Sequence, residues 1–457
     1  MMSRTALHAS LLLSVCAALL TGCASIREGV DGRHVPVGIS PSDESVENRS
    51  LDLPALRDDS SLDDYLKYAA LNNPGLEAAF SRWKAALERI PQAKSLPDPR
   101  FNYAYFIENV ETRVGPQEQK LGLSQTFPWF GKLSLKGDIA GEMAAAEREA
   151  YEKTKLRLFY EVKAAYHDYY YLARSLTITK EHLKLVGNLE AVARTRFKTG
   201  TAPHGSVVQA QVELGKLADR LKTLESLRKP ITARLNAALN RSTHSPLPWP
   251  KALPYSTLGL TDEAVRELLI QHNPDLKRLE RLAAKEGHAV ALARKEYFPD
   301  ITVGAEYVST GEANMPDVAD SGKDPVMAMI SVNIPIWYGK YRAAEREAML
   351  QLSAVRKEKG DFKNRLLSGL ELALYHFRDA ERKVDLYRDT LIPKAEESRK
   401  VAQQGFEAGK VTFISLIDAE RILLEFRLAA ENALAEKGKR RAELEMLTGS
   451  ELTGKNE

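Results

Sequence analysis

Trp129-Phe130-Gly131-Lys132 is repeated further along the chain as Trp337-Tyr338-Gly339-Lys340. Because other short segments recur in the same order at nearly constant spacing, the sequence predicts one duplicated unit in which one loop has been lengthened. The offset between the copies grows from 200 to 209 residues across these pairs: Asn73-Pro74-Gly75-Leu76 with Asn273-Pro274-Asp275-Leu276, Leu96-Pro97-Asp98 with Phe298-Pro299-Asp300, Tyr166-His167 with Tyr375-His376, and Phe197-Lys198-Thr199-Gly200 with Phe406-Glu407-Ala408-Gly409.

Residues 1–22 have the features of an export signal. Arg4 supplies a positive charge, and the apolar run at 6–20 is too short for a membrane-spanning helix. The run ends in Leu20-Thr21-Gly22-Cys23, which resembles the lipobox of bacterial lipoproteins. That resemblance implies cleavage before Cys23, lipidation of Cys23 and, since no aspartate follows it closely, sorting to the outer membrane. The alternative is an ordinary secreted protein with a cysteine at this position.

The composition argues against several classes of function. The 65 basic and 62 acidic residues nearly cancel, so no nucleic-acid partner is expected. Cys16 would be lost with the leader, so the mature chain would have neither an internal disulfide nor a thiolate metal cluster. The metalloprotease, serine hydrolase and dinucleotide-binding motifs are absent, so neither an enzyme nor a cofactor is predicted. No apolar stretch after the leader is long enough for a spanning helix, so strands would have to cross any membrane.

The two repeats have the same predicted order of elements. A polar tether at 23–60 leads to a first repeat at 61–240, a connecting segment at 241–260, a second repeat at 261–449 and a tail at 450–457. Each repeat is predicted to contain an entering helix, a hairpin, a very long helix and a returning helix. The predicted helices cover residues 61–95, 133–199 and 205–240 in the first copy, and 262–296, 341–408 and 412–447 in the second.

The predicted helix lengths indicate how the helices pack. At 1.5 Å per residue each long helix would measure ~100 Å, far more than the thickness of a bilayer. Apolar residues recur along it in steps of three and four, which is typical of coiled-coil packing. The entering and returning helices are each about half as long, so we expect them to stack end to end beside the long helix. Their junctions would lie midway, where residues 241–260 and the tail could form a belt.

Four short segments of alternating polarity are predicted to be strands. The first hairpin is expected to turn within residues 109–116, and the second has the longer loop, at about 309–325. Strands of about ten residues suit an outer-membrane barrel, but four strands cannot close one. An open edge in lipid would leave backbone groups unpaired, so the chain is expected to oligomerise. The predicted strands lie at 101–107, 120–127, 301–307 and 326–334.

The duplication, the order of strands and helices, and the two helix-tip motifs together resemble the TolC-like outer membrane factor family. The tip motif is Gly200-x5-Ser206-x3-Ala210 in the first copy and Gly409-x5-Ser415-x3-Ala419 in the second. The resemblance implies a homotrimer with a 12-stranded membrane barrel, four strands from each chain, continued by a long coiled-coil helical tunnel in the periplasm. It also implies a passive exit duct in the outer membrane, whose partners are a periplasmic adaptor protein and an inner-membrane transporter.

The resemblance leaves the cargo open. The stretch at 127–132 looks more like the heavy-metal branch of the family than the drug branch, which favours a resistance-nodulation-division system for metal cations. A duct for drugs or for type I protein secretion is the alternative. A lipid-tethered coiled-coil scaffold without a pore is the alternative from another class, and the alternating segments argue against it.

Individual residues also gain expected roles from the resemblance. The family closes its periplasmic end with acidic residues near the second tip, and the corresponding positions here are Ser415 and Asp418. Asp418 is the predicted gate residue, because Ser415 stands where an aspartate is usual. The alternative is a solvated aspartate on a helix face. The helix tips that an adaptor would grip are marked by Phe197, Gly200, Ser206, Phe406, Gly409 and Lys410.

Aromatic residues follow the last strand of each hairpin and are expected to form a girdle at the membrane interface. The alternative is a packed corner between strand and helix. Gly131-Lys132 and Gly339-Lys340 are expected to permit a tight turn and to place a cation near lipid headgroups. The girdle residues are Phe127, Trp129, Phe130, Trp337 and Tyr338.

Two methionines are weak candidates for contact with a soft metal. Met327 and Met329 share a strand face with polar residues and are expected to point into the lumen, where thioethers could touch Cu(I) or Ag(I). Flexible filling of a polar wall is the favoured interpretation, and no metal site is predicted. His167 and His376 occupy equivalent places in the two repeats and are expected to be packing residues.

Overall fold

The computed structural model describes residues 56–57, 60–250, 253 and 258–452. The predicted signal peptide, Cys23, most of the tether and parts of the connecting segment and tail lie outside these residues. All described residues belong to one compact unit, Asp52–Glu457. Its elements are α2 (Leu62–Asn72), α3 (Pro74–Leu87), α4 (Arg89–Lys94), β1 (Arg100–Thr112), β2 (Gly115–Phe127), α5 (Lys132–Lys198), α6 (His204–Ala238), α7 (Asp262–His272), α8 (Pro274–Lys295), β3 (Ile301–Thr310), β4 (Val326–Val332), α9 (Tyr338–Asp385), η2 (Leu386–Leu391), α10 (Ile392–Glu407) and α11 (Phe413–Thr448).

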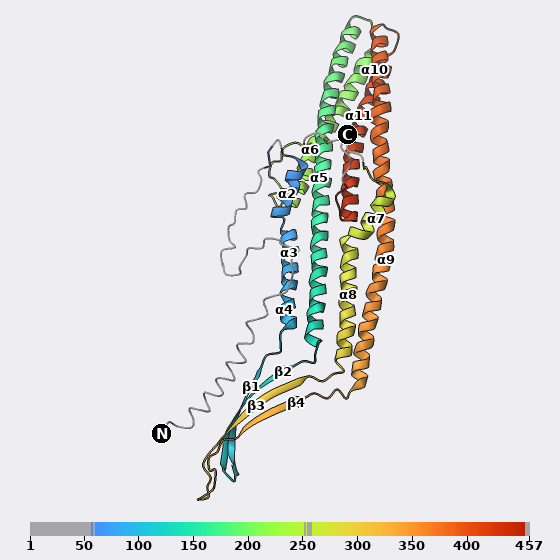
Figure 1. Cartoon of the computed structure of the whole chain (residues 1–457). Helices are drawn as coiled ribbons and strands as arrows, with labels where there is room; N and C mark the ends of the chain where they lie inside the picture. Colours follow the sequence, from blue (N-terminus) through green and yellow to red (C-terminus); the bar gives the residue numbers. More distant parts are fainter. Residues whose placement is uncertain (1–55, 58–59, 251–252, 254–257, 453–457) are drawn as a thin grey trace. The chain divides into compact units, whose positions relative to one another are not determined.

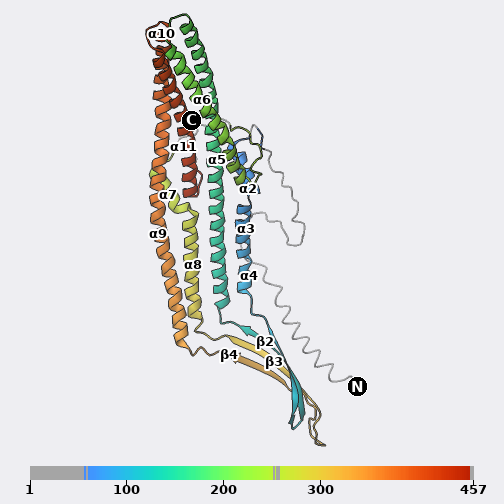
Figure 2. The same ribbon diagram turned by 180° about the vertical axis from the view of Figure 1, so that it is seen from behind.

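The helices of this unit run side by side, and the strands continue from one end of them (Figure 1). Nearest the strands, α3 packs on α5, α5 on α8, and α8 on α9. Farther from the strands, α5 is accompanied by α6 and α11, and α10 packs on α11, as the view from behind also shows (Figure 2). None of the described helices combines enough length with enough apolar character to cross a bilayer.

The two long helices differ in continuity. The helix predicted at 133–199 is confirmed, since α5 runs unbroken for 67 residues. The helix predicted at 341–408 is not uniform, because a π-helical segment, η2, separates α9 from α10. Pro393 follows this segment and has no N–H to donate, so the hydrogen-bond ladder shifts there from the α to the π pattern.

The half-length helices of the first repeat meet at Asn73, which confirms the predicted end-to-end pairing. The Asn73 Oδ1 accepts a hydrogen bond from the backbone N–H of Leu76 at 3.0 Å and thereby caps the start of α3. The Asn73 Nδ2 donates to the carbonyl oxygen of Ala238, in the last turn of α6, at 3.1 Å. Pro74 follows at the first helical position, where its missing N–H costs nothing. One side chain therefore joins the start of one helix to the end of another.

The second repeat uses the same joint. Asn273 caps α8 by accepting from the N–H of Leu276 at 3.0 Å, and its Nδ2 donates to the carbonyl oxygen of Leu447 at 2.8 Å. The returning helices both end in a left-handed residue, Asn240 in the first repeat and Gly449 in the second. The recurrence of Asn-Pro in the sequence is thus explained by one capping geometry that is needed twice.

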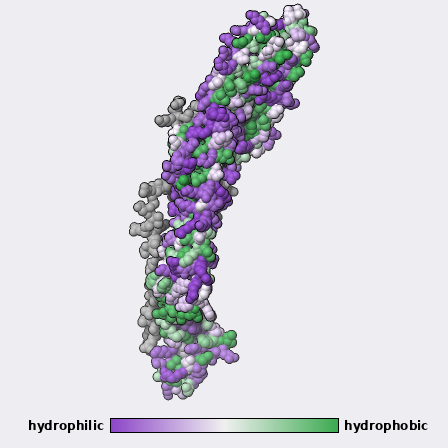
Figure 3. Space-filling model, turned by 90° about the vertical axis from the view of Figure 1, so that its right-hand side faces the viewer, coloured by the Kyte–Doolittle hydropathy of each residue, from purple (hydrophilic) through white to green (hydrophobic). Residues whose placement is uncertain are grey.

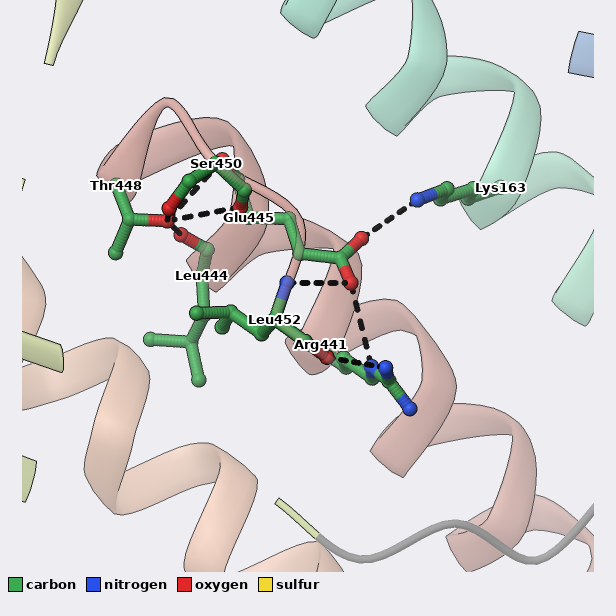
Figure 4. A network of polar contacts seen from close by, with 7 residues as sticks. All are labelled: Lys163, Arg441, Leu444, Glu445, Thr448, Ser450 and Leu452. Atoms are coloured by element: carbon green, nitrogen blue, oxygen red, sulfur yellow. Dashed lines mark hydrogen bonds and ion pairs between the residues drawn. The ribbon is translucent and has the colours of Figure 1, made fainter. Parts of the chain in front are cut away.

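The end of α11 is fixed by a polar network that encloses a buried leucine (Figure 4). The Glu445 carboxylate forms an ion pair with Lys163 of α5 at 2.6 Å and accepts a hydrogen bond from Arg441 Nε at 3.2 Å. Glu445 also accepts from the N–H of Leu452 at 3.4 Å, and Arg441 donates to the carbonyl oxygen of Leu452. The side chain of Leu452 is fully buried in an apolar cluster with α7 and α9. These contacts hold the chain beyond α11 against the middle of the helical layer.

The strands form one antiparallel sheet in the order β1-β2-β3-β4. The first hairpin is longer than predicted, because Thr112 pairs with Gly115 and the turn is Arg113-Val114 instead of 109–116. Gly115 has a φ of 131°, and an added Cβ there would lie 1.8 Å from the carbonyl oxygen of Gly311. Only glycine therefore fits at position 115, where the start of β2 lies against the residue that follows β3 in the other repeat.

The second hairpin carries the longer loop, as predicted, since β3 ends at Thr310 and β4 begins at Val326. The last strand ends at Val332, two residues before the expected 334. At that point the N–H of Asp300 donates to the Asn333 side chain, while the Asn333 N–H still donates to the carbonyl oxygen of Asp300 at 3.4 Å.

Hydrophobic side chains remain exposed on the sheet of the single chain. Figure 3 shows hydrophobic surface at the strand end as well as in patches along the helices. The two edge strands, β1 and β4, each have a neighbour on one side among the described residues. Their exposed apolar residues are Phe101, Tyr103, Tyr105, Ile107 and Val110 on β1, and Val326, Met327, Met329, Ile330 and Val332 on β4.

Candidate functional site

The two helix tips farthest from the strands have the same backbone geometry. Gly200 has a φ of 74° and Gly409 a φ of 72°, which glycine adopts without strain. After Gly200, the N–H of Thr201 bonds to the carbonyl oxygen of Arg196 at 2.8 Å, and after Gly409 the Lys410 N–H bonds to that of Gly405 at 2.7 Å. These bonds close the last turns of α5 and α10 and reverse the chain. The glycine of each tip motif is therefore required by the turn.

The residues predicted for adaptor docking divide into two groups. Phe197 is 44% exposed and Lys410 is also exposed, so both present side chains at the tips. Phe406 and Ser206 are buried, and the Phe406 ring packs edge-on against Phe413 at 5.4 Å. Phe406 and Ser206 therefore shape the tips from inside the chain, and docking of an adaptor at the tips that these residues mark stays a prediction.

The predicted gate residues lie in the first two turns of α11. Thr412 caps this helix, and its Oγ1 accepts from the N–H of Ser415 at 3.3 Å. Ser415 and Asp418 are both exposed and lie one turn apart on the same face. The Asp418 carboxylate forms an ion pair with Arg421 at 3.0 Å, and Arg421 reaches Glu213 of α6 at 3.3 Å. Sequence reasoning missed Arg421, although its spacing of three residues from Asp418 was a usable signal.

A cluster of ionisable side chains, in which His182 and Glu420 are buried, lies next to this face. His182 of α5 and Glu420 of α11 approach to 4.0 Å, and Arg399 of α10 lies 3.6 Å from the other Glu420 oxygen. Burial lowers the pKa of His182 to about 4. Burial also raises the pKa of Glu420, against the opposing effect of Arg399. The cluster ties three helices together just below the tips.

At the other end of α5, the structure overturns the expected place of Lys132. Gly131 does adopt the left-handed conformation, with a φ of 88°, so the tight turn is confirmed there. The Lys132 side chain, however, is only 2% exposed and forms ion pairs with Asp300 at 2.9 Å and Glu296 at 3.2 Å. Burial opposes its charge, yet the hydrogen bond to Asp300 and the nearby Glu296 raise the Lys132 pKa overall. Lys132 therefore joins the two repeats and does not reach lipid headgroups.

The equivalent dipeptide of the second repeat, Gly339-Lys340, has a different structure. Gly339 lies inside α9 and has no left-handed backbone, so the expected tight turn is absent at that position. The chain instead bends before the helix, where the N-cap Trp337 has a ψ of 63°. The repeated Gly-Lys dipeptide thus has two different structural roles.

The outer membrane efflux protein family model matches residues 66–241 and 265–450 of the chain. The chain belongs to this family. It is 27% identical over 311 residues to the Toxin and drug export protein A of Aggregatibacter actinomycetemcomitans, which covers 66% of this chain and 67% of that protein. It is 23% identical over 391 residues to the Cobalt-zinc-cadmium resistance protein CzcC of Cupriavidus metallidurans, covering 80% of this chain and 85% of that protein.

The chain has the same fold as CusC, a protein whose crystal structures concern the conformational changes that accompany folding and transmembrane channel formation. It superposes with a TM-score of 0.71 at 16% identity and covers 85% of this chain and 92% of that one. The family predicted from the repeats and tip motifs is therefore confirmed, and the fold of a single chain agrees with a solved relative.

In this outer membrane efflux protein, the aromatic residues after the hairpins are mostly exposed. Phe130 is 79% and Trp337 73% exposed, and Phe127 and Tyr338 are exposed to a lesser degree. Trp129 differs, because its ring stacks on Phe298 with centroids 5.4 Å apart and an interplanar angle of 10°. Trp129 is thus part of a packed corner, whereas the other four rings remain available for contacts outside the chain.

The methionine and histidine candidates differ in their exposure and surroundings. Met327 and Met329 are exposed on β4, and no group of three or more His, Cys, Asp or Glu side chains in the described part of the chain could hold an ion. His167 is buried and packs so closely on Gly438 that an added Cβ there would lie 2.2 Å from its ring. Burial lowers the His167 pKa to about 4, so the expectation of a packing residue is confirmed. His376 is half-buried.

Proposed function

We propose that this outer membrane efflux protein is the passive exit duct of a tripartite efflux system, built from three copies of the chain. The observation that carries the proposal is a four-stranded sheet with two open edges that continues into long, paired helices. Such edges leave backbone groups unpaired, which lipid does not tolerate. Three copies would supply a 12-stranded barrel and extend it as a helical tunnel into the periplasm.

The helical layer supports the same assembly. It has α3 at one side and α9 at the other, so joining the α3 side of one copy to the α9 side of the next would generate a closed ring. Exposed apolar side chains on both sides would be covered in such a ring. They are Leu71 on α2, Phe80 on α3, and Met349, Leu350, Leu372 and Tyr375 on α9.

We infer the following division of the chain. Residues 1–22 are the signal peptide, and Cys23 carries the lipid that helps to hold the protein in the outer membrane. The tether at 23–60 precedes the repeats at 61–240 and 261–449, with 241–260 between them and 450–457 as a tail. Since one acyl chain holds a protein only weakly, the barrel would supply further anchoring. Mass spectrometry of the purified protein should find a lipidated N-terminus at Cys23, and an unmodified N-terminus elsewhere would overturn this assignment.

The proposed partners act at the two ends of the tunnel. A periplasmic adaptor would grip the helix tips through exposed residues such as Phe197 and Lys410, and an inner-membrane transporter would supply the energy. The aromatic residues Phe130 and Trp337 would lie at the membrane interface. The duct itself needs no cofactor and performs no catalysis.

For the cargo we propose heavy-metal cations, and the observation that favours them is the likeness to a cobalt-zinc-cadmium resistance protein over most of the chain. Drugs, toxins or secreted proteins are the second candidates, favoured by the likeness to a toxin and drug export protein. Deleting the gene and measuring survival on zinc, cadmium, copper and a panel of drugs separates them. Loss of tolerance to drugs alone would reject the metal assignment.

The proposed duct is tested by assembly and conductance. Native mass spectrometry of the detergent-extracted protein should give a trimer and no stable folded monomer. The same material should form conducting pores in planar bilayers. A well-folded monomer, or a trimer that never conducts, would reject the duct in favour of a lipid-tethered scaffold.

The proposed gate is Asp418, which three-fold symmetry would bring to one axis as three carboxylates. Carboxylates held close together attract cations, so divalent ions on the periplasmic side should reduce conductance. Asp418→Ala should weaken this block, and Arg421→Gln should strengthen it by removing the partner of Asp418. The block should be modest and sensitive to salt, because Ser415 leaves a single acidic layer. An unchanged block in both variants would place the gate elsewhere.

A further inference from the structure

The side of α3 that faces away from α5 carries a row of charges. Ala79 and Ala86 of α3 are buried, and α3 packs on α5. Glu77, Lys84 and Glu88, here called the α3 row, follow one another in steps of seven and four residues and share the opposite side of the helix. Glu77 and Glu88 are exposed, and none of the three forms an ion pair within the described part of the chain. Beginning from the sheet, the charges of the α3 row are negative, positive, negative.

The side of α9 that faces away from α8 carries the opposite charges. Glu345 and Lys359 of α9 form ion pairs with α8, at 2.8 and 2.6 Å. Lys357, Asp361 and Arg365, here called the α9 row, follow one another in steps of four residues, lie on the other side of α9 and are all exposed. Asp361 and Arg365 pair with each other at 2.9 Å, whereas Lys357 has no ion-pair partner among the residues that the structure describes. Beginning from the sheet, the charges of the α9 row are positive, negative, positive.

Contacts with α5 give the height of the α3 row above the sheet. Trp83 stacks on Tyr151 of α5 with ring centroids 6.0 Å apart. Nearer the sheet, the Lys94 side chain lies over Gly137 of α5, where an added Cβ would be 2.3 Å from it. Glu88 stands midway between Trp83 and Lys94 along the chain. It is therefore level with the middle of the α5 segment between those two contacts.

Contacts across α8 give the height of the α9 row. Glu142, in that same segment of α5, forms an ion pair with Arg281 of α8 at 3.5 Å. The preceding residue, Glu280, forms an ion pair with Lys359 of α9 at 2.6 Å. Since Lys359 lies between the first two charges of the α9 row, the α3 row and the α9 row stand at the same height above the sheet.

A ring of copies brings the two rows together. Rotation about the ring axis keeps every residue at the same height, and in the proposed ring α3 of one copy lies beside α9 of the next. Opposite charges then face one another at each level. Two copies joined through the same side, α3 to α3 or α9 to α9, would instead place like charges at each level, which is unfavourable. The facing pairs of the ring are Glu88 with Lys357, Lys84 with Asp361, and Glu77 with Arg365.

We propose that these pairs form an ion-pair ladder between copies, and that the ladder selects the head-to-tail ring over association through like sides. The ladder rests on the proposed trimer and adds the side chains that hold it together. The Lys84 ammonium lies over the Phe80 ring at 5.4 Å, at the edge of this surface. Exposed small residues on α3 permit close approach of the helices. They are Ala78, Ser81 and Ala85.

A short thiol crosslinker tests the contact nearest the sheet. A chain with Glu88→Cys and Lys357→Cys should give linked dimers and trimers on a denaturing gel, and Cys23 would carry lipid instead of a free thiol. Each cysteine alone should give no linked product, whereas association through like sides would link Glu88→Cys to the same position of a second copy. The matched control combines Glu88→Cys with Arg356→Cys, because Arg356 is exposed but lies about 100° around α9 from Lys357. It should give much less product.

Charge reversal tests the ladder itself. Glu88→Lys and Lys357→Glu each place like charges at all three contacts of a ring, so either should lower the fraction of trimer in native mass spectrometry on the order of tenfold. The chain that carries both substitutions has opposite charges again and should recover the parent fraction. That recovery would also show that neither substitution prevents folding. Arg356→Glu is the control and should leave the fraction of trimer unchanged.

The outcomes separate the ladder from the duct. A trimeric parent protein whose Glu88→Cys and Lys357→Cys chain gives no more linked product than the control would overturn the ladder and leave the duct unaffected. Single reversals that keep the parent fraction of trimer, or a double reversal that recovers none of it, would do the same. Linked trimers that never conduct in planar bilayers would reject the duct and keep the ladder. A monomeric parent protein would reject both.

Discussion

The two repeats share one plan, yet their long helices occupy different environments. Tyr166 of α5 is 3% exposed, whereas Tyr375, its counterpart in α9, is 64% exposed. The helix α5 is packed by α3, α6, α8 and α11, and α9 mainly by α8 and α11. The central helix is unbroken, and the helix at the side of the layer changes to the π pattern before Pro393. Equivalent sequences therefore give equivalent elements, but the neighbours of each element decide which side chains are buried.

The largest loss of stability should come from removing Tyr166, the buried one of the two equivalent tyrosines Tyr166 and Tyr375. The Tyr166 ring packs edge-on against Tyr65 with centroids 5.3 Å apart in the apolar cluster of the first repeat. Tyr166→Ala should lower the free energy of unfolding by about 3–5 kcal/mol, the cost of an aromatic-to-alanine change in a core. Tyr375→Ala should cost less, because its ring is mostly exposed within the chain and would be covered only by the neighbouring copy in the proposed trimer. Thermal melting of both variants, followed by helical circular dichroism, compares them, and equal losses would contradict the difference between the repeats.

The next largest effect is the pH dependence of stability caused by His167, whose counterpart in the second repeat is His376. Burial holds the folded-state pKa of His167 at about 4, below the usual 6.5. Between these values the unfolded chain binds a proton that the folded chain excludes, so stability falls as the pH drops through this window. At low pH the free energy of unfolding should be lower by roughly 3 kcal/mol because of this one group. Melting temperatures of His167→Gln should therefore depend less on pH between 6.5 and 4 than those of the parent protein.

His376→Gln is the control for this measurement, since His376 is half-buried at the equivalent place. Its melting temperatures should follow those of the parent protein across the window. An identical pH dependence in His167→Gln and the parent would show that another group causes the acid sensitivity.

A smaller difference is expected between the two asparagine joints. Asn273 is 4% exposed, whereas Asn73 is half-buried and is supported by Asn72, whose Nδ2 donates to the carbonyl oxygen of Leu239 at 2.9 Å. Asn273→Ala should therefore cost about 2 kcal/mol and Asn73→Ala about 1 kcal/mol, through loss of a helix cap and a buried hydrogen bond. Chemical denaturation of both variants measures the difference.

Asn273→Asp refines this comparison because it keeps the capping oxygen and removes the amide donor. It also places a negative charge at the carbonyl end of α11, where the helix dipole is unfavourable to anions. We expect it to be no more stable than Asn273→Ala. A more stable aspartate variant would mean that the cap alone matters at this joint.

The smallest effect should follow from Pro393→Ala. An alanine restores the missing N–H donor, so the amides of η2 should return to the α pattern with a change in stability below about 1 kcal/mol. Hydrogen exchange of peptides covering residues 386–393 should become slower. Unchanged exchange would indicate that packing at the side of the layer, and not the proline, sets the π segment.

Much of the fold followed from local patterns. The helices, the four strands and the half-length pairing were predictable because periodicity, Asn-Pro starts and tip glycines are local signals. The extension of the first hairpin to Thr112 was missed because Gly115-Pro116 was assigned to the turn, whereas Gly115 pairs with Thr112 and lies against Gly311 of the other repeat. The π segment was missed because Pro393 was not weighed within a strongly periodic run.

The sequence by itself determined the duplication, the order of elements, the family and the positions of the tip turns, because these depend on spacing along the chain. Only the tertiary structure decided the environment of Lys132, which is bound to Asp300 across 168 residues of sequence. It alone decided that Phe406 is buried and that Arg196 donates a hydrogen bond to its carbonyl oxygen, across 210 residues. Spacing determines which face a side chain shares within its own element, whereas burial and pairing depend on which distant elements pack against that face.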